Sequence, residues 1–198
     1  MINNRGMARA GATMVASGTV ALLAPTGCSW SGSRSAAALF SSGPAHTIST
    51  PTRLGSYTRN PSLEKAMDVN GLKEQMTKTS SERASGILSA VYAQGNVTPG
   101  GGGSQQVFMF VGGHLPNDDP ASSIASFRQA YPRAQMVSAG SLGGEAACAS
   151  TTSNQGSVAM CAWFDNDTFG TLVSPTMSAA KLANTLETVR PGIERVGQ

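Results

Sequence analysis

Two cysteines in the C-terminal half of the sequence are the residues whose types and spacing point most directly to chemistry. Cys148 and Cys161 flank a short polar segment, and Trp163 follows two residues after the second cysteine. If Asn154 and Gln155 form the tip of a two-residue hairpin, the two cysteines face each other at a non-hydrogen-bonded position. Their Cα atoms then lie within roughly 4.5 to 5.5 Å of each other. That separation suits a disulfide.

A metal site and a redox pair are the alternatives to a structural disulfide. A metal would need two or more further ligands, but the only histidines, His46 and His114, stand at no zinc-ligand spacing from these cysteines. A redox pair more often has the short Cys-x-x-Cys spacing. We therefore favour a structural bridge between Cys148 and Cys161, which closes a loop of about 14 residues and stabilises the fold by roughly 3 kcal/mol. We expect Trp163 to pack against it, and we expect no metal or cofactor.

A second group of polar residues could form an active site. His114 precedes Asp118 and Asp119 by four and five residues, a spacing that could suit a histidine–carboxylate site. The better supported interpretation is structural: a strand ends near His114, and the two acids serve a turn and a helix N-cap. The segment 165–168, Asp-Asn-Asp-Thr, offers oxygens for Ca²⁺, but it lacks the glycine and the distal glutamate of an EF-hand loop. We expect a turn there.

The N-terminus has the order of a secretory signal. Two arginines precede a weakly apolar stretch, which ends at a Gly-Cys pair. We interpret 1–27 as a signal peptide, starting at Met1 or Met7, and Cys28 as the site of lipid attachment in a lipoprotein-type signal. The alternatives are soluble secretion after a cleavage site such as 36–38, a retained single-pass anchor, and a cytoplasmic protein. The preferred interpretation predicts an extracytoplasmic protein held at the membrane by its N-terminal lipid or signal segment.

Composition restricts the partners. The chain has 14 Lys and Arg against 11 Asp and Glu, a net charge of +3, and it loses two arginines if 1–27 are removed. It contains no run of basic residues, so nothing favours nucleic acid as a partner. The segment 28–46 is rich in Ser, Gly and Ala and predicts a flexible tether. A domain then occupies 47–198.

Hydrophobic periodicity and turn residues predict a single α+β domain. We expect a βαββαβ order, then a β-meander and a C-terminal helix, giving a mostly antiparallel sheet with its helices largely on one face. The expected elements are a strand over 47–58 broken at Pro51, a broken or bent helix over about 61–78 interrupted at 70–71, strands at 84–94 and 106–113, a helix starting at Pro120, a short strand near 134–140, three strands between 144 and 175, and a helix opened by Ser178. The strand at 106–113 is apolar enough to be covered on both faces.

The segments "GGEAAC" and "CAWFDNDTFGTLVSP" resemble a pattern found in secreted, lipid-anchored or membrane-tethered actinobacterial proteins. The resemblance covers about 143–196, and "TPTRLGSYTR" near the start of the domain is also similar. It implies an extracytoplasmic α+β domain with a disulfide, and it supplies no active site.

These observations favour a noncatalytic cell-surface or secreted domain that binds a protein or an envelope component. The alternatives are a secreted hydrolase-like enzyme with a site near His114, Asp118 and Asp119, and a structural accessory subunit. Convergence of those three side chains in a pocket would favour the enzyme.

Overall fold

The structure is a computed structural model of the 198-residue chain, and it describes residues 46–80, 83–95, 97–99, 105–153 and 156–197. The predicted signal peptide 1–27, the lipidation candidate Cys28 and all of the predicted tether except His46 lie outside these residues. Among the described residues, no helix has the length and the apolar character needed to cross a membrane.

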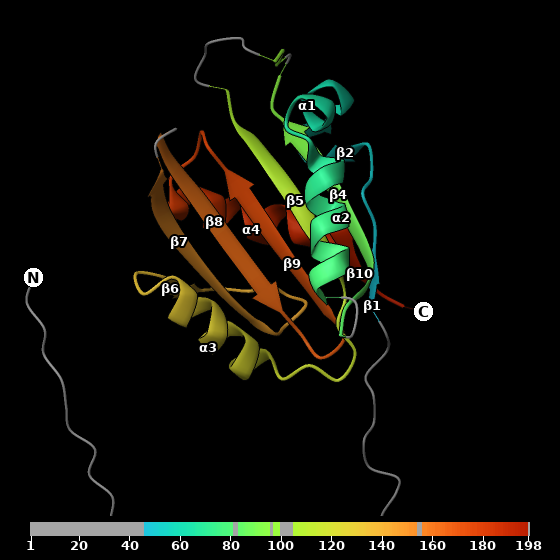
Figure 1. Ribbon diagram of the computed structural model, residues 1–198, viewed down its shortest axis with the longest axis vertical. Helices are drawn as coiled ribbons and strands as arrows, with labels where there is room; N and C mark the ends of the chain where they lie inside the picture. Colours follow the sequence, from blue (N-terminus) through green and yellow to red (C-terminus); the bar gives the residue numbers. More distant parts are fainter. Residues whose placement is uncertain (1–45, 81–82, 96, 100–104, 154–155, 198) are drawn as a thin grey trace, which may run out of the picture. The chain divides into compact units, whose positions relative to one another are not determined.

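An eight-stranded sheet forms the centre of the domain (Figure 1). Its strand order is β2-β3-β4-β5-β9-β8-β7-β6, and every neighbouring pair is antiparallel. The strands span Arg53–Leu54 (β2), Tyr57–Arg59 (β3), Ser85–Ala93 (β4), Val107–His114 (β5), Gln135–Val137 (β6), Glu145–Ser153 (β7), Gly156–Phe164 (β8) and Thr168–Ser174 (β9). Strand β5 lies inside the sheet, and Val107 to Gly113 are all buried, which confirms the predicted strand covered on both faces.

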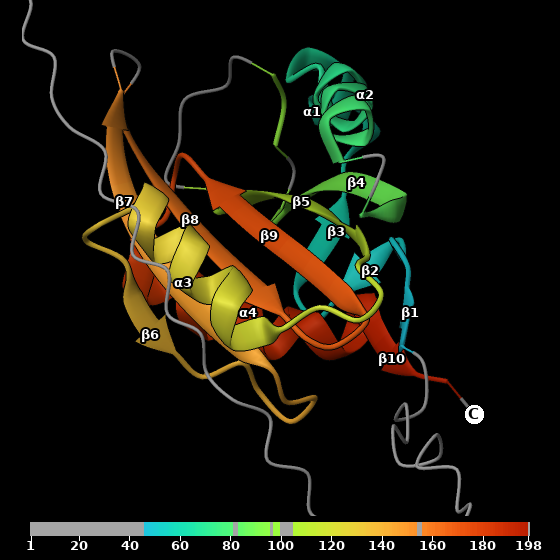
Figure 2. The same cartoon turned by 60° about the horizontal axis from the view of Figure 1, so that its bottom comes forward.

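Four helices are present among the described residues, and three of them lie on one face of the sheet. They span Pro61–Ala66 (α1), Val69–Ser80 (α2), Pro120–Ala130 (α3) and Ala179–Ile193 (α4). Helices α2 and α3 lie in front of the sheet in Figure 1, whereas α4 lies behind it, and Figure 2 shows α3 and α4 on opposite sides of β7 and β8. The predicted α+β class, with a mostly antiparallel sheet and most helices on one face, is therefore confirmed.

Alternation along each strand divides the core into two layers. On the α4 face, the apolar side of α4 shares one cluster with side chains from seven strands of the sheet, among them Tyr92, Phe110 and Trp163. On the other face, α1 and α2 contribute Leu63 and Val69 to a second cluster. Helix α3 covers β7 there, with Ile124 fully packed in a third cluster. The stripe predicted for α4, made of Leu182, Leu186, Val189 and Ile193, is buried as expected.

Helix starts follow the predicted capping residues. Asn60 Oδ1 accepts a hydrogen bond from the Leu63 backbone N–H at 3.0 Å, and Ser178 Oγ accepts one from Lys181 at 3.3 Å. Asp119 occupies the N-cap position of α3, but its side chain makes no capping hydrogen bond there. The break in the first helical region falls at residues 67–68, where Asp68 has φ 48°, and not at 70–71 as predicted, because Gly71 is accommodated inside α2.

A second, two-stranded sheet joins the two ends of the described domain. It pairs β1 (His46–Ile48) with β10 (Glu194–Val196) in antiparallel register, and His46 lies opposite Val196. The sequence predicted one broken strand over 47–58, where the structure has β1, β2 and β3, and it predicted no strand after α4. Strand β10 was missed because three residues that follow a helix directly are too few for a period of two to be visible.

Candidate functional site

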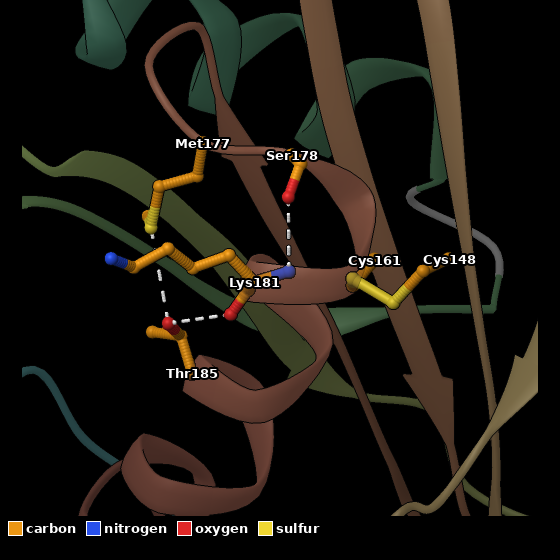
Figure 3. The surroundings of a disulfide bond; sticks show 6 residues. All are labelled: Cys148, Cys161, Met177, Ser178, Lys181 and Thr185. Atoms are coloured by element: carbon orange, nitrogen blue, oxygen red, sulfur yellow. Dashed lines mark hydrogen bonds between the residues drawn. A yellow bond between two sulfur atoms is a disulfide. The ribbon is translucent and has the colours of Figure 1, made fainter.

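The predicted disulfide is present between Cys148 and Cys161. The hairpin has the predicted register, with Ser153 opposite Gly156 and Cys148 opposite Cys161, and the two Cα atoms are 4.0 Å apart. Both cysteines are buried in the layer that faces α4, and Figure 3 shows the bridge beside the first turn of that helix. Its position in the core fits a structural bridge that fastens β7 to β8 beneath α4.

The structure distributes the predicted His114, Asp118 and Asp119 group over different environments. His114 ends β5 between Ser85 and Thr168 on the neighbouring strands. The Asp118 side chain is 1% exposed and accepts a hydrogen bond from the exposed Arg83 at 3.1 Å. Asp119 is exposed at the start of α3. Among the described residues, these three do not form a group of closely spaced ligand atoms.

A different set of charged side chains gathers where β1, the β8–β9 turn and the end of α4 meet. We call it the buried charged cluster, and it consists of His46, Asp165, Asp167, Arg190 and Glu194. The β8–β9 turn forms as predicted, with the Asp165 N–H donating to the Thr168 carbonyl at 2.9 Å. Asp165 of this turn contacts Arg190 near the end of α4, and Asp167 contacts His46 on β1.

Arg190 is the centre of this cluster, with a side chain that is 1% exposed. Its Nε donates to Glu194 at 2.8 Å, and one terminal nitrogen donates to the carbonyls of Ala139 and Gly143 at 2.7 Å each. The other terminal nitrogen donates to Asp165 and, at 3.4 Å, to Glu194. All five guanidinium N–H groups are thus used, and the guanidinium carbon also lies 5.6 Å from the centre of the Trp163 ring.

Glu194 is fully buried and accepts hydrogen bonds at both oxygens. Besides Arg190, Trp163 Nε1 donates to Oε2 at 2.9 Å and the Thr168 hydroxyl donates to Oε1 at 2.8 Å. Burial alone would raise the pKa of Glu194, but its hydrogen bonds and the charge of Arg190 lower it below the ordinary value. Glu194 is therefore ionised at neutral pH.

The Trp163 indole occupies space that Gly170 leaves open. The two residues are paired across β8 and β9, and a Cβ atom on Gly170 would overlap with Trp163 Cζ2. Trp163 also stacks on Phe110, with ring centres 5.9 Å apart. The sequence placed Trp163 on the same face as Cys161, and both belong to the same core layer, but its hydrogen bond to Glu194 was not predicted.

The pKa of Asp165 is raised, whereas that of Glu194 is lowered. Its Oδ1 has no hydrogen-bond partner although the side chain is only 6% exposed. Burial is the main cause that raises the pKa of Asp165, followed by the nearby Glu194 carboxylate, and together they outweigh Arg190 and bring it to about 7. Near neutral pH, Asp165 is divided between its protonated and ionised forms.

His46 closes the cluster from the solvent side. Asp167 contacts its Nδ1 at 2.7 Å and accepts a hydrogen bond from its backbone N–H at 2.6 Å. Partial burial lowers the pKa of His46, but the hydrogen bond to Asp167 and the charges of the surrounding carboxylates reverse this effect and raise it above 6.5. The sequence placed His46 at the end of the tether, whereas the structure has it as the first residue of β1.

From the raised pKa values of Asp165 and His46 we predict that the free energy of unfolding falls as the pH rises from about 5 to about 8. Folded Asp165 keeps a proton up to a pKa of about 7, but the unfolded carboxyl loses it near 3.8. The folded state therefore binds more protons in this interval, so the free energy of unfolding falls as the pH increases. His46 acts in the same direction, because its contribution is complete below 6.5 and is lost above its raised pKa. Glu194, with its lowered pKa, stays ionised throughout.

Thermal unfolding in buffers containing EDTA would measure this dependence. Asp165→Asn should flatten the change in Tm between about pH 5 and pH 8, whereas Asp119→Asn, an exposed control, should leave it unchanged. Equal slopes in the wild type and the Asp165 variant would show that Asp165 does not bind the proton.

One signal in the sequence pointed to the cluster. Arg190 stands four residues after Leu186 and four before Glu194, so a charged pair interrupts the apolar stripe of α4. In a core-facing helix, such a pair predicts buried partners from another element. The sequence could not identify those partners, because His46 and Asp167 are 121 residues apart.

No protein-family model, curated protein or solved structure matches this chain. The resemblance to actinobacterial envelope proteins therefore stays a prediction from the sequence pattern.

Proposed function

We propose that this protein is a noncatalytic extracytoplasmic domain, anchored at the membrane surface through lipidated Cys28, that binds a protein or another component of the cell envelope. The observation that carries the proposal is the disulfide between Cys148 and Cys161. Disulfides persist in oxidising compartments and are rare in the cytosol, where thiols are kept reduced. A bridge in the centre of the core therefore favours export.

The leader supports the same location from the other end of the chain. The segment 1–27 has the order of a secretory signal and ends immediately before Cys28. A Ser-, Gly- and Ala-rich tether over 28–46 would let a domain that starts at β1 stand away from the membrane. The resemblance to actinobacterial lipoprotein-type domains fits this arrangement.

The positions of the ionisable side chains favour a binding role over catalysis. The His114, Asp118 and Asp119 set that could have formed an active site is divided among a strand end, an ion pair with the exposed Arg83 and an exposed helix start. The buried charged cluster instead ties β1 and β10 to the β8–β9 turn. These groups hold the domain together where the chain enters it.

Replacing Cys28 by alanine tests the anchor. We expect the Cys28→Ala protein either to move from the membrane fraction to the medium or to be retained as an unprocessed precursor, because the lipid-accepting thiol is lost. Cell fractionation with immunoblotting would measure this in the native host. Replacing the exposed Ser122 of α3 by alanine provides a control that should not alter fractionation. An unchanged distribution and mass of the Cys28 variant would contradict lipidation.

A further inference from the structure

The buried charged cluster contains three groups of the kinds that bind metal ions. A ring nitrogen of His46 and carboxylate oxygens of Asp165 and Glu194 all lie within 4.8 Å of one another. The three residues come from β1, the β8–β9 turn and the start of β10. Only the folded chain brings them together, because His46 and Glu194 stand near opposite ends of the domain.

One carboxylate oxygen of this cluster lacks a hydrogen-bond partner. Asp165 Oδ1 has no hydrogen-bond partner, although the side chain is more than nine-tenths buried and its other oxygen is bound by Arg190. A buried carboxylate oxygen without a donor is costly. Arg190 cannot supply a further bond, because its five N–H groups are already engaged.

The charges of the cluster do not balance once His46 and Asp165 have both lost their protons. Asp165, Asp167 and Glu194 carry three negative charges when they are ionised, and Arg190 supplies one positive charge. With His46 neutral, as a metal ligand must be, an excess of two negative charges is left in a site that is largely buried. Uncompensated charge in the interior is strongly unfavourable. A single divalent cation would neutralise this excess.

We propose that the cluster binds one divalent transition-metal cation, with His46, Asp165 and Glu194 as its protein ligands. One imidazole nitrogen and two carboxylate oxygens suit Zn²⁺ or Mn²⁺ better than Ca²⁺, which prefers oxygen ligands alone. Asp167 acts as a positioning residue, since it accepts a hydrogen bond from the His46 backbone N–H at 2.6 Å. His46 and Asp167, which are 17% and 28% exposed, provide the route by which the ion enters.

The bound cation holds β1, the first strand of the described domain, in place. It would crosslink β1, the β8–β9 turn and β10, so metal binding would favour the arrangement in which β1 is paired with β10. This goes beyond the proposed anchoring and binding role, and it does not depend on whether Cys28 is lipidated.

The test uses the full chain with Cys28→Ser, so that the thiol outside the disulfide cannot bind the metal. The protein is treated with EDTA and desalted, and Zn²⁺ and then Mn²⁺ are added during calorimetric titration and thermal unfolding. We expect one ion per chain and a Tm that increases with metal concentration. Proton release should accompany binding at mildly acidic pH, since protons compete for the same ligands.

Variants locate the site. His46→Ala and Asp165→Asn should each weaken binding by at least about tenfold, while circular dichroism verifies that they fold. His114→Ala removes the only other histidine and should bind as the wild type does. Absence of binding to the wild type would overturn the proposal, and a pH-dependent Tm without any metal effect would identify protons as the occupants. Binding that survives both cluster variants would place the metal elsewhere and would also overturn it.

Discussion

Replacing Arg190 by leucine is expected to lower the free energy of unfolding by about 3 to 5 kcal/mol. The substitution leaves Glu194 and Asp165 buried without their cationic partner, and it removes the donors to the carbonyls of Ala139 and Gly143. Urea unfolding followed by circular dichroism would measure the loss. Arg195→Leu is the matched control, because Arg195 is exposed on β10 and should change stability by no more than about 0.5 kcal/mol.

A combined variant separates charge from packing in this result. Adding Asp165→Asn and Glu194→Gln to Arg190→Leu removes the uncompensated charges, so the triple variant should lose less stability than the sum of the three single variants. Losses that add up would show that the three side chains do not interact. Equal losses in Arg190→Leu and Arg195→Leu would contradict the central position of Arg190.

Loss of the disulfide is expected to cost about 3 kcal/mol in the chain-entropy account, because the bridge joins residues 13 apart in sequence. Cys148→Ala and Cys161→Ala should lower Tm by similar amounts, and the double variant should be no less stable than either single variant. Differential scanning calorimetry would measure all three, with the reduced wild-type protein as a further comparison. Substantially additive losses from the two single substitutions would show that the cysteines do not act as one bridge.

Much of the fold could be predicted from local patterns. The register of the β7–β8 hairpin follows from its polar tip, because the period of two along a strand fixes which residues face each other. That is why Cys148 and Cys161 could be paired before their geometry was known. The apolar stripe of α4 and the capping roles of Asn60 and Ser178 could also be predicted from the sequence. Both features depend on residues within four positions of one another.

The buried charged cluster could not be predicted in this way. Its contacts join His46 to Asp167 and Arg190 to Asp165, pairs that are 121 and 25 residues apart, and no period along the chain relates them. The pairing of β1 with β10 likewise depends on where α4 ends in space. His46 has no recognisable metal-ligand spacing in the sequence, and its contacts with Asp167 and β10 depend on the folded chain.

We propose that this protein is an exported domain, anchored through Cys28 and stabilised by the disulfide between Cys148 and Cys161. Mass spectrometry of the protein from its native host tests it most directly, with membrane fraction and medium analysed separately and thiols alkylated with and without prior reduction. We predict a lipid-bearing N-terminus at Cys28 in the membrane fraction, and Cys148 and Cys161 that become alkylated only after reduction. An intact N-terminus with three freely alkylated cysteines would contradict export and lipid anchoring and place the protein in a reducing compartment.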